Sequence, residues 1–422
     1  MRILESDENI DAIYLDFLKA FDKVDVGILL KKVKSLGITG KLGRWIHSFL
    51  TERKQIVLVN GRKSQVSNVI SGVPQGTVLG PLLFLIYISD IGNKVKASLK
   101  VYVDDTKVKK AIKNSSDVED LQSDLDRKYS WAEDNNMTFN GSKFQLMRYG
   151  RNENIKEDTI YFTNNMEEVI EEFEEIKDLG VIMNNKADFE SNIAHIIKKA
   201  RQKVGWILRS FHSRNINFLK HMYKSLVTPH IDYCSQLWMP TESKDIEKIE
   251  KVQRDFLRNI PGLRELDYWD QIKNLKMLSL QRRLEIYRII YSWKILENLA
   301  TNCGLQVLPD SEKSRQGRRL KVSEVNQKAP TKRRLEQVFQ VNGPKLFNSL
   351  PARIRNMTRK KGIGLEDIKQ SLDQYLENVP DQPKIDGLTP GSQDNSGVFS
   401  NFILHQTKPG TMGGGGGRSH GT

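Results

Sequence analysis

Two adjacent aspartates interrupt an apolar stretch, LKVYVDDTKV, that covers residues 99–108. Neighbouring carboxylates repel each other and resist removal from water, so Asp104 and Asp105 call for a nearby cation. A third carboxylate, Asp16, follows another apolar stretch in the segment AIYLDFLKAFD. Carboxylates at the ends of apolar strands are what a two-metal phosphoryl-transfer site requires. We expect Asp104 to be the firmer ligand and Asp105 the more variable one.

A glycine-rich loop, SGVPQGTVLGP, covers residues 71–81. Its glycines allow the backbone to approach a ligand closely. Gln75 carries both a donor and an acceptor, so it can contact a base or a sugar without adding charge. Phe21, five residues after Asp16, offers a ring that can wall a nucleotide sugar. Taken alone, each feature fits an ordinary turn or core position at least as well.

The spacing of apolar residues predicts the elements that must position these groups. Helix 116–136 is predicted to begin with a capping box of Ser116 and Glu119. A hairpin is predicted around Asn60–Gly61. The other predictions are strands at 11–18, 99–110, 144–149, 159–163 and 179–183, and helices at 26–54 and from about Pro81. Together they make an α+β domain that covers residues 1–185.

The chain changes character after this domain. Apolar residues at a 3.6-residue period predict successive helices over residues 186–300. Residues 301–334 carry nine Lys or Arg against three acids, which predicts a mobile basic linker that could also act as a nuclear-import signal. A small helical region is predicted at 335–386. The glycine-rich residues 387–422 are predicted to be disordered.

The formal net charge of +14 favours a polyanionic partner such as nucleic acid, although a merely basic surface is an equal alternative. Two cysteines exclude a disulfide framework and a Cys-rich zinc site. The longest apolar run, residues 81–88, is too short to span a bilayer. We therefore expect no membrane association and an intracellular location, in the nucleus or the cytoplasm. The sequence indicates no oligomeric state.

The order and spacing of the segments are more specific than any one of them. Three segments resemble motifs A, B and C of reverse transcriptases: YLDFLKAFD, GVPQGTVLGPLLFLIYISDI and YVDDTK. Their amino-acid sequences are similar to those of jockey-type non-LTR retrotransposons. The resemblance extends from residue 11 to about 386, through FNGSKFQLMRYG (139–150), KDLGVIM (177–183), VTPHIDYCSQLW (227–238) and LPARIRN (350–356).

The resemblance implies a right-hand polymerase fold: an α+β palm with an antiparallel sheet, partial fingers and an all-α thumb. Carried over by motif, Asp16, Asp104, Asp105 and the carbonyl of Phe17 would bind two Mg²⁺ ions. Phe21 would exclude ribonucleotides, and Gln75 and Gly76 would contact the incoming nucleotide and the template. Lys143 would lie near the departing phosphates as a general acid.

The implied function is that of an RNA-directed DNA polymerase, a nucleotidyltransferase that extends a DNA primer on an RNA template with deoxynucleoside triphosphates. The chain begins just before motif A, so the upstream fingers and endonuclease of such elements are expected to be missing. A catalytically silent nucleic-acid-binding remnant is therefore the alternative function. A group II intron maturase is a weaker third hypothesis, because the wording after motif C suits retrotransposons better.

Several basic and aromatic residues of the predicted thumb have two interpretations. Its cations fit contacts with nucleic-acid phosphates, but a solvated helix face explains any one of them: Lys198, Lys199, Arg201, Lys203 and Arg209. Its tryptophans at helical spacing are predicted to be core residues: Trp206, Trp238, Trp269 and Trp293. His47 and His230 lack zinc-ligand spacing and are interpreted as structural.

Overall fold

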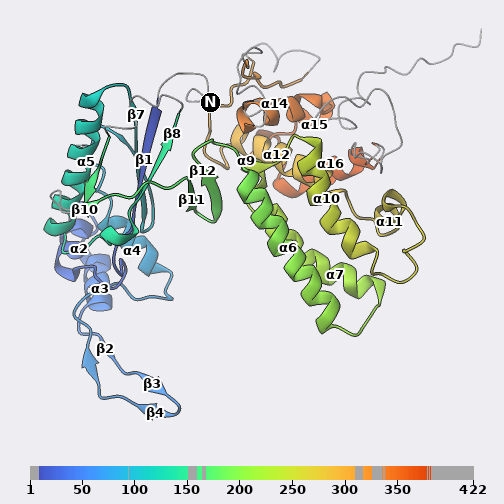
Figure 1. Ribbon diagram of the computed structural model, residues 1–422. Coiled ribbons are helices and arrows are strands. Elements are labelled where there is room, and N and C mark those ends of the chain that lie inside the picture. Colours follow the sequence, from blue (N-terminus) through green and yellow to red (C-terminus); the bar gives the residue numbers. More distant parts are fainter. Residues whose placement is uncertain are drawn as a thin grey trace, which may run out of the picture. The chain divides into compact units, whose positions relative to one another are not determined.

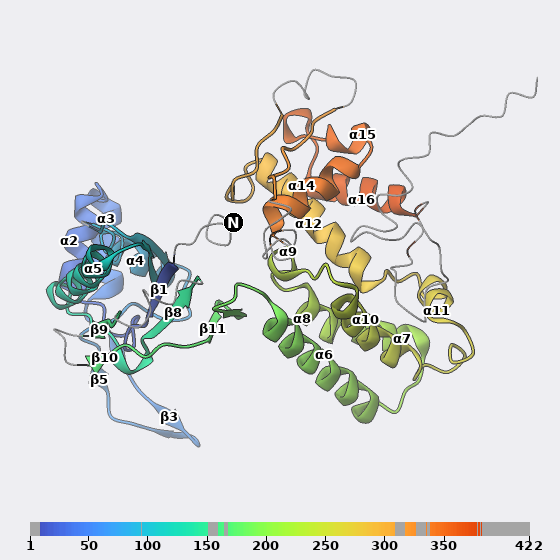
Figure 2. The same ribbon diagram turned by 45° about the horizontal axis from the view of Figure 1, so that its top comes forward.

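The computed structural model describes residues 9–93, 95–150, 159–163, 168–308, 317–325 and 338–377, together with residues 335, 379 and 381. These residues form two compact units (Figures 1 and 2). The first unit holds the described residues up to Asp178 and Asn184–Ala187. The second holds Leu179–Met183 and the described residues from Asp188 onward.

A four-stranded antiparallel sheet, in the order β6-β7-β1-β8, is the framework of the first unit. β1 (Asn9–Leu15) pairs with β7 (Asp105–Ile112) on one side and with β8 (Gln145–Tyr149) on the other. β6 (Ser98–Tyr102) is the strand beyond β7. Mixed helices and antiparallel strands confirm the predicted α+β class.

Helices cover one face of this sheet (Figure 2). They are α2 (Val26–Ser35), α3 (Gly40–Leu50), α4 (Leu79–Tyr87) and α5 (Ser115–Asp134). Ile13 and Leu15 of β1 are buried in the same core as Leu29, Phe84 and Leu125 of these helices. Because strand side chains alternate, Tyr14 lies on the opposite face.

Two predicted helix boundaries are wrong. The predicted helix 26–54 is two helices, because Gly37 adopts a left-handed φ of +81° that no right-handed helix contains, and the second helix ends at Leu50. Helix α5 is capped by Asn114, whose side chain accepts a hydrogen bond from the Asp117 N–H at 3.2 Å. Ser116 already lies inside the first turn, so it forms no capping box.

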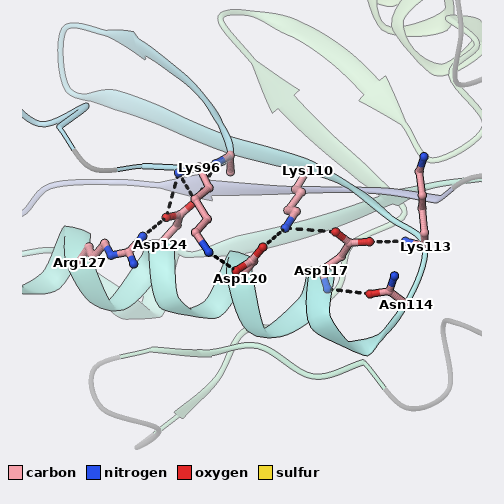
Figure 3. A network of polar contacts seen from close by, with 9 residues as sticks. Lys96, Lys110, Lys113, Asn114, Asp117, Asp120, Asp124 and Arg127 are labelled. Atoms are coloured by element: carbon pink, nitrogen blue, oxygen red, sulfur yellow. Dashed lines mark hydrogen bonds and ion pairs between the residues drawn. The ribbon is translucent and has the colours of Figure 1, made fainter.

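A row of charges on α5 connects this helix to both strands of the β6–β7 hairpin (Figure 3). The fully buried Asp124 accepts hydrogen bonds from the backbone N–H groups of Lys96 (3.0 Å) and Ala97 (2.7 Å), just before β6. Asp120 binds the ammonium groups of Lys96 (2.8 Å) and of Lys110 on β7 (2.7 Å). Hydrogen bonds from Lys110 and Lys96 lower the pKa of Asp120 to about 2. We call Asp120 and Asp124, with these partners, the α5 clasp.

A β-arm connects α3 to the glycine-rich loop and extends away from the sheet (Figure 1). It comprises β2 (Lys54–Gln55), β3 (Leu58–Val59), β4 (Arg62–Lys63) and β5 (Ser67–Asn68), paired β2 with β5 and β3 with β4. Asn60 and Gly61 turn the arm with φ values of +49° and +80°. Positive φ at both positions is typical of a type I′ hairpin turn, so the predicted hairpin is confirmed.

Two further strand pairs follow β8. β9 (Phe162–Thr163) pairs with β10 (Glu168–Val169) in the first unit. The chain passes from the first unit to the second within residues 175–188, where β11 (Glu175–Asp178) and β12 (Val181–Asn184) lie. The predicted short strands near residues 144–149, 159–163 and 179–183 are confirmed with shifted ends.

The second unit is helical, as the 3.6-residue period predicts. Its helices are α6 (Glu190–Ser210), α7 (Ile216–Leu226), α8 (Thr228–Asp232), α9 (Ser235–Trp238), α10 (Ser243–Leu257), α11 (Tyr268–Asn274), α12 (Leu280–Leu296), α14 (Phe339–Ser349), α15 (Ala352–Arg355) and α16 (Leu365–Leu376). Trp238, Trp269 and Trp293 are buried, whereas Trp206 is 46% exposed, so its prediction as a core residue is wrong. Across the described residues, no helix has the length and apolarity needed to cross a membrane.

The basic segment 301–334 is not a mobile arm where the structure describes it. Val307 pairs with Leu320, and the buried guanidinium of Arg318 binds Glu297 Oε1 at 2.8 Å. The sequence prediction failed here because a single buried ion pair leaves no periodic signal. Residues 309–316 and 326–334, and the tail predicted to be disordered at 387–422, lie outside the described residues.

Replacing Asp124 with alanine should lower the free energy of unfolding of the first unit by roughly 1–3 kcal/mol, since it removes the acceptor of the part-buried Lys96 and Ala97 N–H groups. Urea denaturation measures this change. Glu133→Ala, at an exposed position of the same helix, is the matched control and should change stability by less than about 0.5 kcal/mol. Equal stability of the two variants would contradict a structural role of the clasp.

Candidate active site

The register of the sheet brings three aspartates to one end of it. Leu15, the last residue of β1, pairs with Thr106 of β7, so Asp16 comes next to Asp105. In the β6–β7 hairpin, Tyr102 pairs with Asp105, and only Val103 and Asp104 lie between them. The chain therefore turns at the two aspartates. Asp104 is half-buried, and Asp105 is exposed at the hairpin end.

The turn has an unusual backbone conformation. Val103 has a φ of +57°, in the left-handed region that a β-branched residue rarely adopts. Such a residue stores on the order of 1–3 kcal/mol of strain, which the surrounding structure must offset. The paired strands on both sides of the turn supply that support.

Like charges perturb the carboxylates of this turn. Burial, followed by the charges of Asp104, Asp16 and Asp178, raises the pKa of the Asp105 carboxyl above its ordinary value. Each neighbouring negative charge favours the protonated form of Asp105. This direction agrees with the sheet register, which places Asp16 and Asp104 beside Asp105.

Lys143 supplies the positive charge at the site. Its Nζ lies 2.7 Å from Oδ2 of Asp16. It reaches this position from a short 3₁₀ turn, η1 (Gly141–Lys143), directly before β8. The hydrogen bond and charge of Asp16, with a smaller contribution from Asp104, raise the pKa of the Lys143 ammonium. At neutral pH the site therefore has a protonated donor beside its carboxylates.

The donor set fits a hard divalent cation, because carboxylate oxygens are the ligands that Mg²⁺ prefers. The cluster of like charges that raises the Asp105 pKa is also what a cation would relieve. Among the residues that the structure describes, no group of three or more His, Cys, Asp or Glu side chains is arranged to hold a metal ion. Lys143 instead occupies one oxygen of Asp16.

Phe17 is fixed firmly beside Asp16. Its side chain is 4% exposed and stacks on Phe139, with ring centroids 4.3 Å apart. The backbone on both sides of it is bonded: the Leu18 N–H donates to the Thr138 carbonyl, and the Asn140 N–H donates to the Asp16 carbonyl, both at 2.8 Å. Phe17 therefore holds the backbone that presents Asp16.

The glycine-rich loop is attached to the segment that follows Asp16. The Val73 N–H donates to the Phe21 carbonyl at 2.9 Å, and the Phe21 ring stacks on Phe84 of α4 at 4.6 Å. At Gly72, with a φ of +83°, a Cβ atom would lie 2.9 Å from the Asp22 carbonyl oxygen. Only glycine fits there. The Phe21 ring is half-buried at this junction.

Gln75 and Gly76 form the exposed tip of this loop. The Gln75 amide donates to Oδ1 of Asp22 at 2.7 Å. Gly76 has a φ of +75°, and a Cβ atom there would meet no neighbour within 4 Å. The tip is therefore open, and Gln75 is oriented by a carboxylate.

Sequence reasoning missed three residues that shape the site. Asp22 accepts a hydrogen bond from Gln75 and orients it, and it is the last residue of the motif A segment YLDFLKAFD. Asp178 raises the pKa of Asp105 and binds Lys107 Nζ at 3.1 Å. Lys107 also donates to the Tyr14 hydroxyl at 2.5 Å, on the face of the sheet away from the helices. The segment KDLGVIM was the available signal for Asp178, but its sequence assigns no partner.

The family model described as "Reverse transcriptase (RNA-dependent DNA polymerase)" matches residues 5–219, half of the 422-residue chain. The chain therefore belongs to the reverse transcriptase family. This match includes the elements that carry Asp16, the glycine-rich loop, the aspartate turn and Lys143. Members of this family generally use divalent metal ions.

The curated relatives agree with the predicted resemblance. The "RNA-directed DNA polymerase from mobile element jockey" of Drosophila funebris is 30% identical over 276 residues, and that of Drosophila melanogaster is 28% identical over 274 residues. Each alignment covers 62% of this chain and 29% of the relative. The resemblance to jockey-type non-LTR elements is thus confirmed, and the chain spans under a third of these relatives' length.

Solved telomerase structures from Candida tropicalis are also similar to this chain. The apo enzyme has a TM-score of 0.38 at 10% identity and covers 70% of this chain and 52% of its own. A complex with a fragment of telomeric RNA has a TM-score of 0.35 at 13% identity, with 70% and 48% covered. Scores this low do not establish a shared arrangement of domains.

Replacing Asp104 with asparagine should lower the pKa of Asp105, because among the neighbouring carboxylates Asp104 raises that pKa the most. Carboxyl ¹³C NMR titration measures this shift. A raised pKa in the folded state makes Asp105 contribute stability at acid pH that is lost as the pH rises through that pKa. Asp104→Asn should reduce this loss. Asp134→Asn, on the exposed side of α5, should leave the Asp105 titration unchanged, and an unchanged titration in Asp104→Asn would disprove the coupling.

Proposed function

We propose that this chain is an RNA-directed DNA polymerase of a non-LTR mobile element, extending a DNA primer on an RNA template. The observation that carries this proposal is the sheet register, which brings Asp16, Asp104 and Asp105 together at the ends of β1 and the β6–β7 hairpin. Family membership supports the reaction class. The primer, the template and deoxynucleoside triphosphates are the proposed partners.

In this proposal Asp16, Asp104, Asp105 and the carbonyl of Phe17 hold two Mg²⁺ ions. Bound there, the ions would lower the pKa of the primer 3′-hydroxyl and neutralise charge on the departing pyrophosphate. The sheet register fixes the backbone positions of the three aspartates, and their carboxylate oxygens would therefore hold the two ions in defined places. Asp16 must exchange its contact with Lys143 for this role, and an exposed ammonium allows that exchange.

The proposed reaction forms a bond between the primer 3′-oxygen and the α-phosphorus of the nucleotide, and breaks the bond from that phosphorus to the pyrophosphate. The 3′-hydroxyl loses a proton, and the pyrophosphate gains one. Lys143 is the proposed donor of the second proton, since its exposed ammonium reaches the carboxylate end of the sheet. A general acid of this kind typically contributes 10²–10⁴-fold to a rate.

Phe21, Gln75 and Gly76 are proposed to bind the nucleotide. The Phe21 ring is held by Phe84 at the start of the glycine-rich loop, which suits a rigid wall against a ribose 2′-hydroxyl. Gln75, oriented by Asp22, offers an amide to a base or sugar, and Gly76 leaves space for backbone approach.

We assign the palm to the first unit and the thumb to the second. On the second unit, a groove of about 680 Å³ runs along α6 and is lined by cations that suit a nucleic-acid backbone: Lys198, Arg201, Arg209 and Lys248. Phosphate contacts of this kind do not read sequence. Binding should therefore weaken steeply with salt.

A catalytically silent nucleic-acid-binding protein is the competing function. The contact between Lys143 and Asp16, and the lack of a ready metal cluster among the described residues, favour it. Primer extension with Mg²⁺ separates the two, because binding without any extension would support the silent form.

Asp16→Asn and Asp104→Asn should each abolish primer extension on an RNA template while changing nucleic-acid affinity less than about threefold, because the loss concerns metal ligands rather than phosphate contacts. Extension gels and fluorescence anisotropy measure the two properties. Asp134→Asn should extend primers normally. Near wild-type extension by either site variant would reject the assignment.

Phe21→Ala should increase incorporation of ribonucleotides relative to deoxyribonucleotides, because the ring no longer fills the space beside the 2′-position. The ratio of kcat/KM for the two substrates measures this effect. Phe21→Tyr, which keeps the ring and its stacking on Phe84, should retain discrimination. Unchanged discrimination in Phe21→Ala would remove Phe21 from this role.

A further inference from the structure

A small polar cavity lies within the second unit, apart from the carboxylate site. It has a volume of about 200 Å³ and lies between α6, α8 and the residues at the start of β12. Its polar lining consists of Asn192, His195, Lys199, His230 and Tyr233. No acidic side chain lines it among the residues that the structure describes. The cavity is therefore chemically suited to an anion rather than to a cation.

The wall next to β12 is held in place from two directions. The Tyr233 hydroxyl donates to the Leu179 carbonyl at 2.8 Å, and the Ile182 N–H donates to Oδ1 of Asn192 at 3.0 Å. Gly180 has a φ of +86°, and a Cβ atom there would lie 3.2 Å from the Tyr233 ring. The cavity is thus bounded by a fixed turn, not by a loose loop.

Asn192 leaves one donor unused in this cavity. The residue is 1% exposed, and its Nδ2 is buried without a hydrogen-bond partner among the described residues. An unsatisfied buried donor costs about 1–3 kcal/mol. Asn192 Oδ1 already accepts the hydrogen bond from the Ile182 N–H. This bond fixes the orientation of the side-chain amide and leaves Nδ2 as the group without a partner in the described part of the chain. A water molecule would satisfy this donor but would leave the surrounding positive charge unbalanced.

Positive charge surrounds the cavity. Lys199 lines it, and Lys203 lies one helical turn further along α6. Burial, followed by the charges of Lys203 and Lys199, lowers the pKa of His230. A bound anion would act in the opposite direction and favour the charged imidazole. His230 is thus placed to report on an anion in the cavity.

The geometry points to a phosphate-binding site in this cavity, in which Asn192 Nδ2, the Lys199 ammonium and His230 donate to the oxygens of a nucleic-acid phosphodiester. Charge-assisted hydrogen bonds of this kind are strong and directional. The polymer as the source of the phosphate rests on the proposed function, whereas the anion site does not. Inorganic phosphate shares the chemistry and is the second source to test.

The test follows the imidazole signals of the full chain labelled with ¹⁵N-histidine, during titration with a short DNA–RNA duplex or with inorganic phosphate. The duplex should shift the His230 signal saturably and raise its pKa. Lys199→Gln and Asn192→Asp should abolish the shift. Asn192→Asp keeps the acceptor for the Ile182 N–H but places a negative charge against the phosphate. Lys273→Gln, an exposed cation of α11 that lines neither the groove nor the cavity, is the matched control and should retain the shift.

Each result decides the proposal. A shift with the duplex supports a phosphodiester occupant, and a shift with inorganic phosphate alone supports the anion site but overturns its nucleic-acid source. No shift with either probe, or an equal shift in both Asn192→Asp and Lys199→Gln, overturns the site. Because neither titration requires nucleotide incorporation, a shifting His230 in a chain that fails to extend primers would refute only the polymerase function.

Discussion

Repulsion between carboxylates is the constraint on which the first unit depends. Asp16, Asp104 and Asp105 come together because β1 and the β6–β7 hairpin end at the same level of one sheet. The turn that completes this arrangement holds Val103 at a positive φ. Charge repulsion and backbone strain both oppose the arrangement, so strand pairing must offset them. The α5 clasp holds the other end of the same hairpin. The clasp uses two carboxylates of its own, but it satisfies each with N–H donors or ammonium groups.

Hydrogen bonds join the glycine-rich loop to the segment after Asp16, so the two form one structural piece. The Gly72 N–H donates to the Val24 carbonyl at 2.8 Å, and the Ser71 hydroxyl donates to the Asp22 carbonyl at 2.9 Å. Arg53 donates to the carbonyls of Ser71 and Gly72 from the other side. A displacement of the loop tip would therefore move the backbone of Phe21, which connects nucleotide contacts to the carboxylate end of the sheet.

The success of sequence reasoning followed the locality of each signal. Alternation and helical period are local, so a strand near β1, extended chain over the β6–β7 hairpin and a helical region that includes α6 were predicted. Adjacent residues on an extended strand point to opposite faces, so Asp104 and Asp105 reach one site only because the chain turns between β6 and β7. The Asn114 cap was missed because Ser116 offered an equally good local pattern, and only the start of the helix decides between them.

Long-range pairings were the part that the sequence could not supply. The contact of Lys143 with Asp16 joins residues 127 positions apart, and Asp178 reaches Lys107 across 71 positions. No spacing pattern in the sequence predicts either of these two contacts. The buried Arg318 shows the same limit. The basic composition of residues 301–334 predicted that its side chain would be exposed to solvent, but Arg318 is buried and forms an ion pair with Glu297. Charged residues were thus the least predictable, because partners decide whether they lie inside or outside.

The cations of α6 illustrate this dependence on partners. Lys198 and Lys199 are adjacent in sequence, yet successive residues on a helix point about 100° apart. Lys198 lines the open groove with Arg201, whereas Lys199 lines the small cavity with Asn192 and His230. The groove offers exposed charges, whose attraction for phosphates is screened by salt within about 8–10 Å. The cavity adds an oriented, buried amide that salt does not screen in the same way. One helix therefore presents an open row of cations on one side and a single fixed amide on another.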